Sequence, residues 1–243
     1  MSIRSLRAAV SFLTVLPVAN ADGSPGERLG RAYFPAIGAL VGFVAGVAYV
    51  VMTALSTPLA GAAVAVAVLA VLTGALHLDG LADSVDGLMT YGDVARRLEV
   101  MRDPRLGSYG VTAIGVIVLL DFAAIASMSP LRAIAGLTIA GALSRLATLA
   151  IIAFVPYVRA AGLGVAAWEP ERRGIDLAVG GGCAVVVCLL DWRRALVALP
   201  IVALVAVSLA VIARRRIGGA TGDICGATAE LCQLATLLVF AVR

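Results

Sequence analysis

Apolar residues in this chain form long stretches separated by short polar segments. Seven stretches predict membrane-spanning helices, at residues 32–55, 58–76, 111–129, 131–155, 177–190, 195–213 and 225–242. Most of them come close to or exceed the ~20 residues that an α-helix needs to cross a bilayer. The pattern therefore predicts an all-α fold, a polytopic transmembrane helical bundle of about seven spans (six to eight), in which residues 1–243 form a single integral membrane domain.

Two segments fit a simple span less well. Residues 3–16 are short and amphipathic and carry Arg4 and Arg7, so we expect a short N-terminal helix at the membrane interface. No cleaved secretory signal is expected there, because the apolar run is short and ends at Leu16-Pro17. Residues 177–190 are brief and rich in glycine, so a tilted or re-entrant element is an alternative to a full span.

Composition agrees with a membrane protein. Hydrophobic residues make up 61% of the chain and charged residues 14%, whereas a soluble domain carries roughly 25% charged residues. Gly38, Gly42 and Gly46 repeat every four residues, which predicts a ridge for close helix packing. The four cysteines form no CxxC pair and lie in or beside apolar stretches, so we interpret them as small packing residues.

The distribution of basic residues predicts the orientation. All 19 basic residues are arginine, and the formal net charge is +4. With the N-terminus in the cytoplasm, most arginines fall in cytoplasmic segments, and only Arg132, Arg193, Arg194 and Arg243 lie on the opposite side. This asymmetry obeys the positive-inside rule. We therefore attribute the basic charge to membrane orientation and expect no nucleic-acid partner.

An acidic motif, His77 to Gly87, directly follows the second stretch. On a helix, Asp79, Asp83 and Asp86 fall on one face within a ~60° arc, where their charges repel. Carboxylates gathered in this way suit a hard divalent cation, and Mg²⁺ fits best. The alternative is a solvated acidic helix end, although three Asp at a membrane boundary are costly without a counter-charge. His77 fits either an interfacial or a catalytic role.

Two further segments carry candidate chemistry. In the loop at 99–110, Asp103 can add a carboxylate, and Arg102 and Arg105 can bind phosphate oxygens or form loop salt bridges. Residues 218–230 form a glycine-rich turn leading into a helix, which is typical of anion sites. In that segment Thr221 and Asp223 are candidate helix caps, and Glu230 follows seven positions after Asp223, inside the span.

Two charged residues, Asp121 and Arg145, are predicted well inside spans. Ionisable residues there are costly and usually face the interior of the bundle. The two side chains can pair with each other, or Arg145 can bind a substrate phosphate.

Together these segments resemble the cobalamin synthase family, the adenosylcobinamide-GDP ribazoletransferases. The resemblance is carried by Phe12–Pro17 (FLTVLP), Phe34–Gly38 (FPAIG), His77–Gly87 (HLDGLADSVDG), Met101–Gly107 (MRDPRLG), Ser144-Arg145 and Gly218–Glu230 (GGATGDICGATAE). It implies a multi-pass enzyme of the bacterial cytoplasmic (inner) membrane that requires Mg²⁺. Such an enzyme joins adenosylcobinamide-GDP to α-ribazole, or to its 5′-phosphate, and releases GMP.

This reaction suggests roles for the candidate residues. Asp79, Asp83, Asp86 and Asp223 are expected to hold Mg²⁺, and Asp103 or Asp223 to act as general base, with His77 as a further catalytic candidate. The expected substrate and phosphate ligands are Arg102, Arg105, Arg145, Thr221 and Glu230. We expect the active site on the cytoplasmic face, and assembly into a homo-oligomer stays open.

Two other functions are alternatives. A CDP-alcohol phospholipid synthase is suggested by the Asp83-x-x-Asp86-Gly87 spacing, but the Ala-Arg that should follow is absent. A transporter would place its charges near the bilayer midplane in repeated halves. Here the carboxylates gather at one face and no halves repeat.

Overall fold

The structure, a computed structural model, describes residues 2–18, 29–159, 165–168 and 172–242. Its α-helices are α1 (Ile3–Leu13), α2 (Phe34–Leu55), α3 (Pro58–Thr73), α4 (Leu76–Met89), α5 (Val94–Val100), α6 (Ser108–Ala126), α7 (Pro130–Phe154), α8 (Arg173–Cys188), α9 (Trp192–Ile217) and α10 (Gly222–Ala241). Short 3-10 turns are η1 (Arg31–Tyr33), η2 (Val165–Trp168) and η3 (Leu189–Asp191). Within these ranges the only β-structure is one isolated bridge, Tyr157 to Ala220, so the all-α prediction is confirmed.

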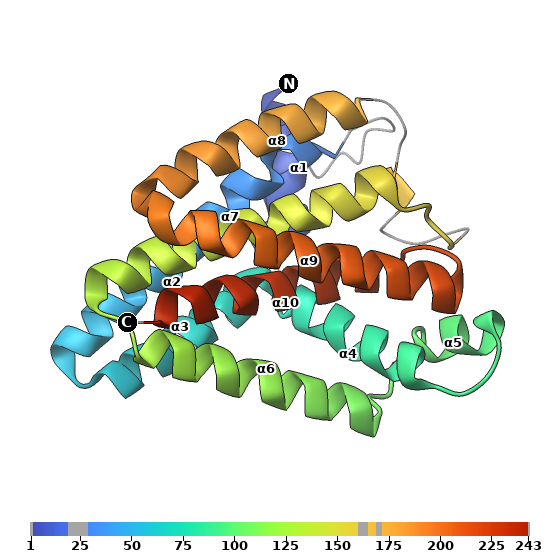
Figure 1. Cartoon of the computed structure of the whole chain (residues 1–243), viewed down its shortest axis with the longest axis horizontal. Helices are drawn as coiled ribbons and strands as arrows, with labels where there is room; N and C mark the ends of the chain where they lie inside the picture. The colour runs from blue at the N-terminus through green and yellow to red at the C-terminus, as the bar shows by residue number, and fades with distance from the viewer. Residues whose placement is uncertain (1, 19–28, 160–164, 169–171, 243) are drawn as a thin grey trace.

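Helices α7 and α10 form the inside of the bundle. Of their most apolar stretches, 78% and 72% of the residues are buried, against 28% for α6 and 17% for the run that contains α8 and α9. The outer helices therefore present mostly apolar side chains to their surroundings, as lipid-facing helices do. This arrangement confirms a polytopic helical membrane bundle (Figure 1).

Five helical stretches in the described part of the chain are long and apolar enough to cross a membrane, or six if the bent pair α3–α4 counts as one. One of the five is the 45-residue run Arg173–Ile217. Figure 1 shows that this run folds back at η3, so that α8 and α9 point in opposite directions. The predicted stretches 177–190 and 195–213 thus correspond to the two arms of a helical hairpin.

The predicted second span, 58–76, corresponds to α3 and the bend that follows it. Helix α3 ends at Thr73, and α4 leaves it at an angle of 86°. The cause lies in Gly74 and Ala75, which both adopt left-handed backbone angles, with φ of +59° and +56°. Two consecutive residues of this kind end the hydrogen-bond ladder of one helix and start another in a new direction. The acidic motif therefore lies on a separate helix, α4.

The glycine ridge on α2 packs against α7, as predicted. A Cβ atom at Gly38 would collide with the backbone of Gly141, and one at Gly42 would collide with that of Leu137. All four cysteines are free, and Cys188, Cys225 and Cys232 are buried, in agreement with a packing role.

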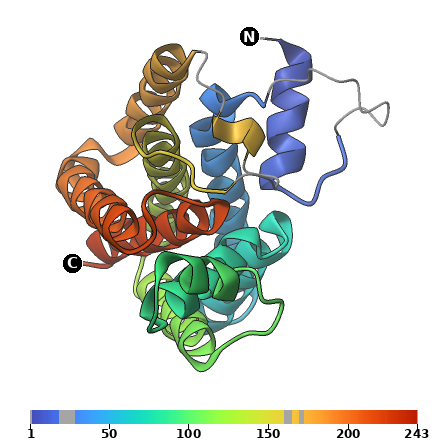
Figure 2. The ribbon, with the colours of Figure 1, turned by 90° about the vertical axis from the view of Figure 1, so that its right-hand side faces the viewer.

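Polar segments gather at one end of the bundle. This active-site end contains α4, α5, the loop 101–107, the ends of α7 and α9 and the start of α10 (Figure 1). The opposite end contains the short turn 56–57, the turn 127–129, η3 and the end of α10. Figure 2 shows α1 at one edge of the bundle, next to α2. Its helical form is confirmed, while its position at a membrane interface stays a prediction.

Candidate active site

Two glycines bring the two polar motifs together. A Cβ atom at Gly80 of α4 would lie 3.1 Å from the Cα atoms of Asp223 and Gly226 in α10. A Cβ atom at Gly226 would lie 3.0 Å from the Cα atom of Gly80. The two backbones therefore lie in close contact with no side chain between them, an approach that glycine favours. This contact holds the acidic stripe of α4 beside the first turn of α10.

A cavity of about 440 Å³ opens at this contact. One part of its wall is polar, formed by His77 and Asp79 of α4, Asp223 of α10 and Arg159 of the segment after α7. Another part is aromatic and carries Phe12, Phe34, Tyr157 and Trp168. A concave site with a few polar groups and an apolar lining is the usual form of a small-molecule site.

Arg159 forms an ion pair with Asp223 across this wall, and both side chains are largely buried. The same guanidinium donates a hydrogen bond to the carbonyl oxygen of Met101 (3.2 Å), which links α10 to the end of α5. Thr221 caps α10 by accepting from the backbone N–H of Ile224 and also bonds to Asp223 (3.2 Å). Thr221 therefore holds the Asp223 carboxylate in place.

The remaining carboxylates of the stripe differ in their surroundings. Asp79 is exposed at the cavity wall, and Asp83 is half-buried one turn further along α4. Asp83 is repelled by the charges of Asp223, Asp79 and Asp86 and is attracted by Arg159. Asp83 and Asp223 thus share the guanidinium of Arg159 as a counter-charge, while Asp79 adds further negative charge beside them.

Asp86, by contrast, is buried and bonded to backbone groups. Its Oδ2 atom accepts from the N–H of Gly107 (2.8 Å) and its Oδ1 atom from the N–H of Gly110 (2.9 Å). A side chain at either glycine would collide with this carboxylate. Asp86 therefore caps the start of α6 from a neighbouring helix and fixes the loop before it.

We asked whether the acidic residues fit a metal ion. In the part of the chain that the structure describes, no three His, Cys, Asp or Glu side chains converge closely enough to hold one together. The donor type nevertheless fits Mg²⁺, because Asp79, Asp83 and Asp223 offer hard oxygens with an excess of negative charge. Arg159 occupies one oxygen of Asp223 in this arrangement.

The candidates in the loop after α5 lie on the surface. Asp103 accepts two hydrogen bonds from the Arg105 guanidinium (2.9 and 2.7 Å), and the Arg105 side chain is 87% exposed. These bonds lower the pKa of Asp103 to about 2. Both residues, with Asp86 and Tyr109, line a separate hollow of about 300 Å³. Arg102 is exposed near the same loop.

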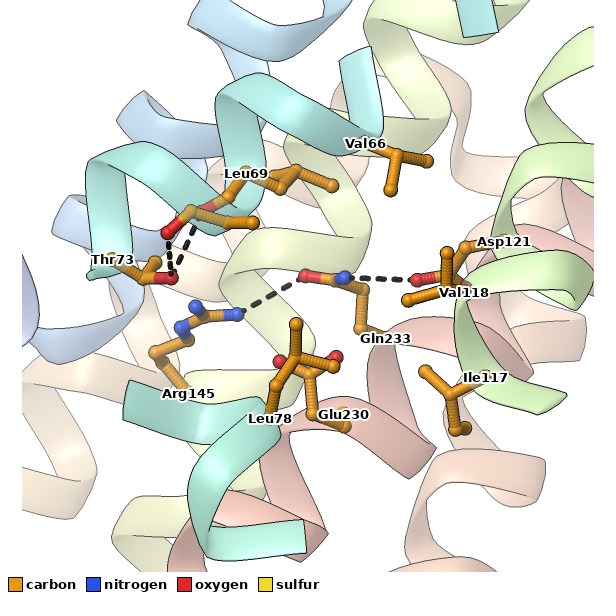
Figure 3. A pocket seen from close by; sticks show the side chains of 11 residues that line it. Val66, Leu69, Thr73, Leu78, Ile117, Val118, Asp121, Arg145, Glu230 and Gln233 are labelled. Carbon is orange, nitrogen blue, oxygen red and sulfur yellow. Dashed lines mark hydrogen bonds between the residues drawn. The ribbon is translucent and has the colours of Figure 1, made fainter. Parts of the chain in front are cut away.

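A second polar group, around Arg145 and Gln233, is buried in the bundle (Figure 3). Arg145 donates to Ser144 (2.8 Å) and to the side-chain oxygen of Gln233 (3.3 Å), and Gln233 in turn donates to Asp121 (3.3 Å). Arg145 and Asp121 are therefore linked through Gln233 and form no direct ion pair. Glu230 lines the same small space of about 20 Å³, which has room for one water molecule.

His77 connects this buried group to the cavity. The Nη2 atom of Arg145 lies 3.3 Å from the Nδ1 atom of His77. A guanidinium can only donate, so Nδ1 must be the acceptor and the ring proton must be on Nε2. In this contact the neutral His77 ring is the acceptor, and its Nε2–H is left as a donor. Arg145 and Glu230 do not line the large cavity, whereas His77, Asp79 and Asp223 do.

Three features of the site escaped the sequence interpretation. The sequence pattern gives Arg159 a role in orientation alone, and it predicts neither the role of Gln233 nor the aromatic wall. Nothing in the sequence near Arg159 indicates its partner, because the bonded Asp223 lies 64 residues further along the chain. For Gln233 a signal existed: an amide inside an apolar span needs hydrogen-bond partners.

Comparison with known proteins adds the family. The sequence profile described as cobalamin-5-phosphate synthase matches residues 5–241. Several relatives are named adenosylcobinamide-GDP ribazoletransferase. The one from Bradyrhizobium diazoefficiens is 38% identical to this chain, over 98% of this chain and 94% of the relative. The one from Stutzerimonas stutzeri is 37% identical, over 98% of each chain. A third, in Rhizobium etli, is 38% identical over 96% of this chain and 94% of the relative.

No solved structure matches the chain significantly. The sequence matches nonetheless cover the acidic motif, the loop after α5 and the glycine-rich start of α10, and they extend over nearly the whole length of both partners. On this evidence, the chain belongs to the cobalamin-5-phosphate synthase family.

Proposed function

We propose that this protein is an adenosylcobinamide-GDP ribazoletransferase. A hydroxyl oxygen of α-ribazole, or of its 5′-phosphate, forms a bond to the phosphorus that carries the cobinamide. The bond from that phosphorus to the bridging oxygen breaks, GMP leaves with this oxygen, and the hydroxyl proton passes to a base. Relatives that match over the whole chain carry this name, which supports the same activity here.

The observation that carries the proposal is the polar wall of the cavity. It combines carboxylates on two helices, Asp79 and Asp223, with the guanidinium of Arg159. Phosphoryl transfer requires in-line positioning and neutralisation of charge more than covalent chemistry. A wall with this composition supplies both a cation site and a direct phosphate ligand.

We propose that Asp79, Asp83 and Asp223 hold Mg²⁺, with Asp86 fixing the neighbouring loop. The bound cation would neutralise the diphosphate and the charge that develops on the leaving GMP. His77, as an Nε2–H donor, can bond a phosphate oxygen, and Arg145 keeps its ring in that form. Arg102 and Arg105 lie outside the cavity and suit initial attraction of the anionic substrate.

We also propose that the enzyme lies in the cytoplasmic membrane with the active-site end facing the cytoplasm. The bias of arginine toward this end supports the orientation. Both substrates then reach the cavity from the aqueous side.

The test uses purified protein in liposomes, with adenosylcobinamide-GDP and α-ribazole as substrates. We expect equal amounts of GMP and a cobalamin product, neither of which forms when one substrate or Mg²⁺ is omitted. A parallel reaction receives CDP-diacylglycerol and an alcohol acceptor. Turnover of that pair, with none of the corrinoid pair, would replace the proposal by a phospholipid synthase.

A further inference from the structure

The aromatic part of the cavity wall consists of two pairs of rings. Phe12 of α1 stacks on Phe34 at the start of α2, with centroids 5.9 Å apart and planes 10° from parallel. Tyr157, in the segment after α7, packs on Trp168 of η2, with centroids 4.5 Å apart. All four residues line the same cavity of about 440 Å³.

Each pair has a buried ring behind a partly exposed one. Phe34 is fully buried, and Trp168 is 7% exposed and donates from its indole N–H to the carbonyl oxygen of Val155 (2.9 Å). Phe12 and Tyr157 are only partly buried. The rear rings thus fix the front rings before any ligand arrives, which lowers the entropy cost of stacking on them.

Two hydroxyls beside the aromatic rings, those of Ser11 and Thr148, are already engaged. The Ser11 hydroxyl donates to the carbonyl oxygen of Leu16 (3.0 Å) and accepts from the N–H of Val18 (3.0 Å). The Thr148 hydroxyl bonds to the carbonyl oxygens of Ser144 and Cys225. A ligand ring that needs several hydrogen bonds would leave groups unpaired here, which is costly.

These properties select among the three ring systems of the proposed reaction. The corrin ring is far larger than the cavity. Guanine carries an N–H, an amino group and a carbonyl oxygen that need partners. The benzimidazole of α-ribazole is flat and apolar, and once bonded to ribose it retains a single ring nitrogen as acceptor.

We propose that the aromatic wall is the subsite for the benzimidazole ring of α-ribazole, stacked on Tyr157 and Phe12. The inference rests on the proposed function and adds which substrate occupies this cavity. Arg159 follows Tyr157 by two residues, so one short segment contributes to both the ring subsite and the phosphate wall. The ribose hydroxyl of a bound ribazole is thereby brought toward Asp79 and Asp223.

A binding experiment tests whether α-ribazole occupies this subsite and requires no turnover. The chain has two tryptophans, and Trp192 lies at the opposite end of the bundle, at the start of α9. The variant Trp192→Phe therefore leaves Trp168 as the only indole reporter. We expect α-ribazole, added to this variant in detergent, to change the Trp168 fluorescence in a saturable way, and GMP at equal concentration to leave it unchanged.

Kinetics supply the second readout. Tyr157→Leu should raise the KM for α-ribazole roughly 5- to 100-fold, since stacking on one aromatic side chain contributes that much to binding. The KM for adenosylcobinamide-GDP should stay within about twofold. Tyr157→Phe keeps the ring and should restore most of the affinity, and Phe12→Leu provides an independent variant on α1.

The outcomes separate this inference from the proposed function. If the wild-type protein releases GMP but α-ribazole leaves Trp168 unaffected and Tyr157→Leu keeps its KM, the subsite is wrong while the function stands. If GMP changes the Trp168 signal in place of α-ribazole, the wall binds guanine and the inference is overturned. If α-ribazole binds but no GMP is released with both substrates, the subsite stands and the function fails.

Discussion

At the scale of single residues, neighbouring carboxylates on α4 have different surroundings. Asp83 is repelled by Asp79 and Asp223 near the cavity, whereas both oxygens of Asp86 accept backbone hydrogen bonds from the start of α6. The regular spacing of the motif conceals this difference. Asparagine, which keeps the size and removes the charge, should therefore act differently at the two positions.

For Asp83→Asn we expect a normally folded protein with a defective reaction. Removing one of three mutually repelling carboxylates relieves repulsion, so the melting temperature should stay equal or rise. The rate of GMP release should fall roughly 10²-fold, and more Mg²⁺ should be needed for half-maximal activity. The measurement is GMP release in liposomes, titrated with Mg²⁺, alongside thermal unfolding in detergent.

Asp86→Asn serves as the matched comparison. Its amide N–H₂ group would face a backbone donor, so we expect the fold to lose about 1.5–3 kcal/mol of stability. The Mg²⁺ dependence of the remaining activity should be unchanged. If the Asp86→Asn protein has normal stability but a shifted Mg²⁺ requirement, Asp86 is a metal ligand, as the sequence predicts.

Asp103 provides a prediction about pH. Because Arg105 lowers the pKa of Asp103 to about 2 from an ordinary 3.8, its carboxylate is ionised at every pH above that range. The contribution of this ion pair to the stability of the folded loop is present above pH 4 and is lost only as the pH falls toward 2. A carboxylate with so low a pKa is a weak base. Asp223 lines the large cavity whereas Asp103 does not, so the geometry also favours Asp223 as the general base.

We expect Asp103→Asn to reduce the rate by less than about tenfold, because loss of a true general base costs 10²–10⁴-fold. The pH–rate profile from pH 5 to pH 9 should keep its shape. Arg105→Gln is the control, since it removes the other member of the same ion pair. A loss above 10²-fold, confined to Asp103→Asn, would restore the base role.

How much of the site can be predicted from sequence depends on how far apart along the chain the interacting residues lie. Asp79 and Asp83 were predicted from local spacing, and their approach to Asp223 was expected because both motifs precede or follow spans at the same face. The Arg159–Asp223 ion pair and the backbone donors of Asp86 were not predicted. Contacts of this kind depend on how the helices pack, which the local sequence pattern does not reveal.

At the scale of elements, the site depends on the contact between α4 and α10. Adding one methyl group at Gly226 forces the Gly80 backbone away, and tight interiors tolerate such insertions poorly. The bend before α4 was not predicted, because apolar residues continue through Gly74 and Ala75 and hide the change of direction. The boundaries of the other long helices follow their apolar runs closely.

For Gly226→Ala we therefore expect a loss of about 1–3 kcal/mol in stability and a strongly reduced rate. The control is Gly181→Ala on α8, where a new Cβ atom meets no other atom within 4 Å. That variant should be neutral or more stable by up to about 1 kcal/mol, as alanine favours helices. Thermal unfolding and GMP release measure both. Equal behaviour of the two variants would contradict the close contact.

At the scale of the whole molecule, the prediction concerns orientation. The Tyr91 side chain is 93% exposed at the active-site end, and Ser129 is exposed in the turn between α6 and α7 at the opposite end. In a cysteine-free background, Tyr91→Cys should react with an impermeant maleimide only in inverted vesicles. Ser129→Cys should react only in intact cells, and it is nearly isosteric with the residue it replaces.

The reverse pattern would place the active-site end outside the cytoplasm. Labelling of both positions from one side would mean that the bundle does not cross the membrane as its helices suggest. Either result would leave the chemistry of the cavity unaffected, because its residues come together within one end of the bundle.

The contact between Gly80 and Gly226 has a consequence for evolution. In most packed cores, a larger residue on one side can be offset by a smaller one on the other, so related sequences drift in compensated pairs. Here neither partner has a side chain left to shorten. A side chain at either position would press on the backbone of the facing helix, so the two helices, and the carboxylates that they carry, would have to shift apart. We therefore expect this pair to vary less across the family than the aspartates' own neighbours.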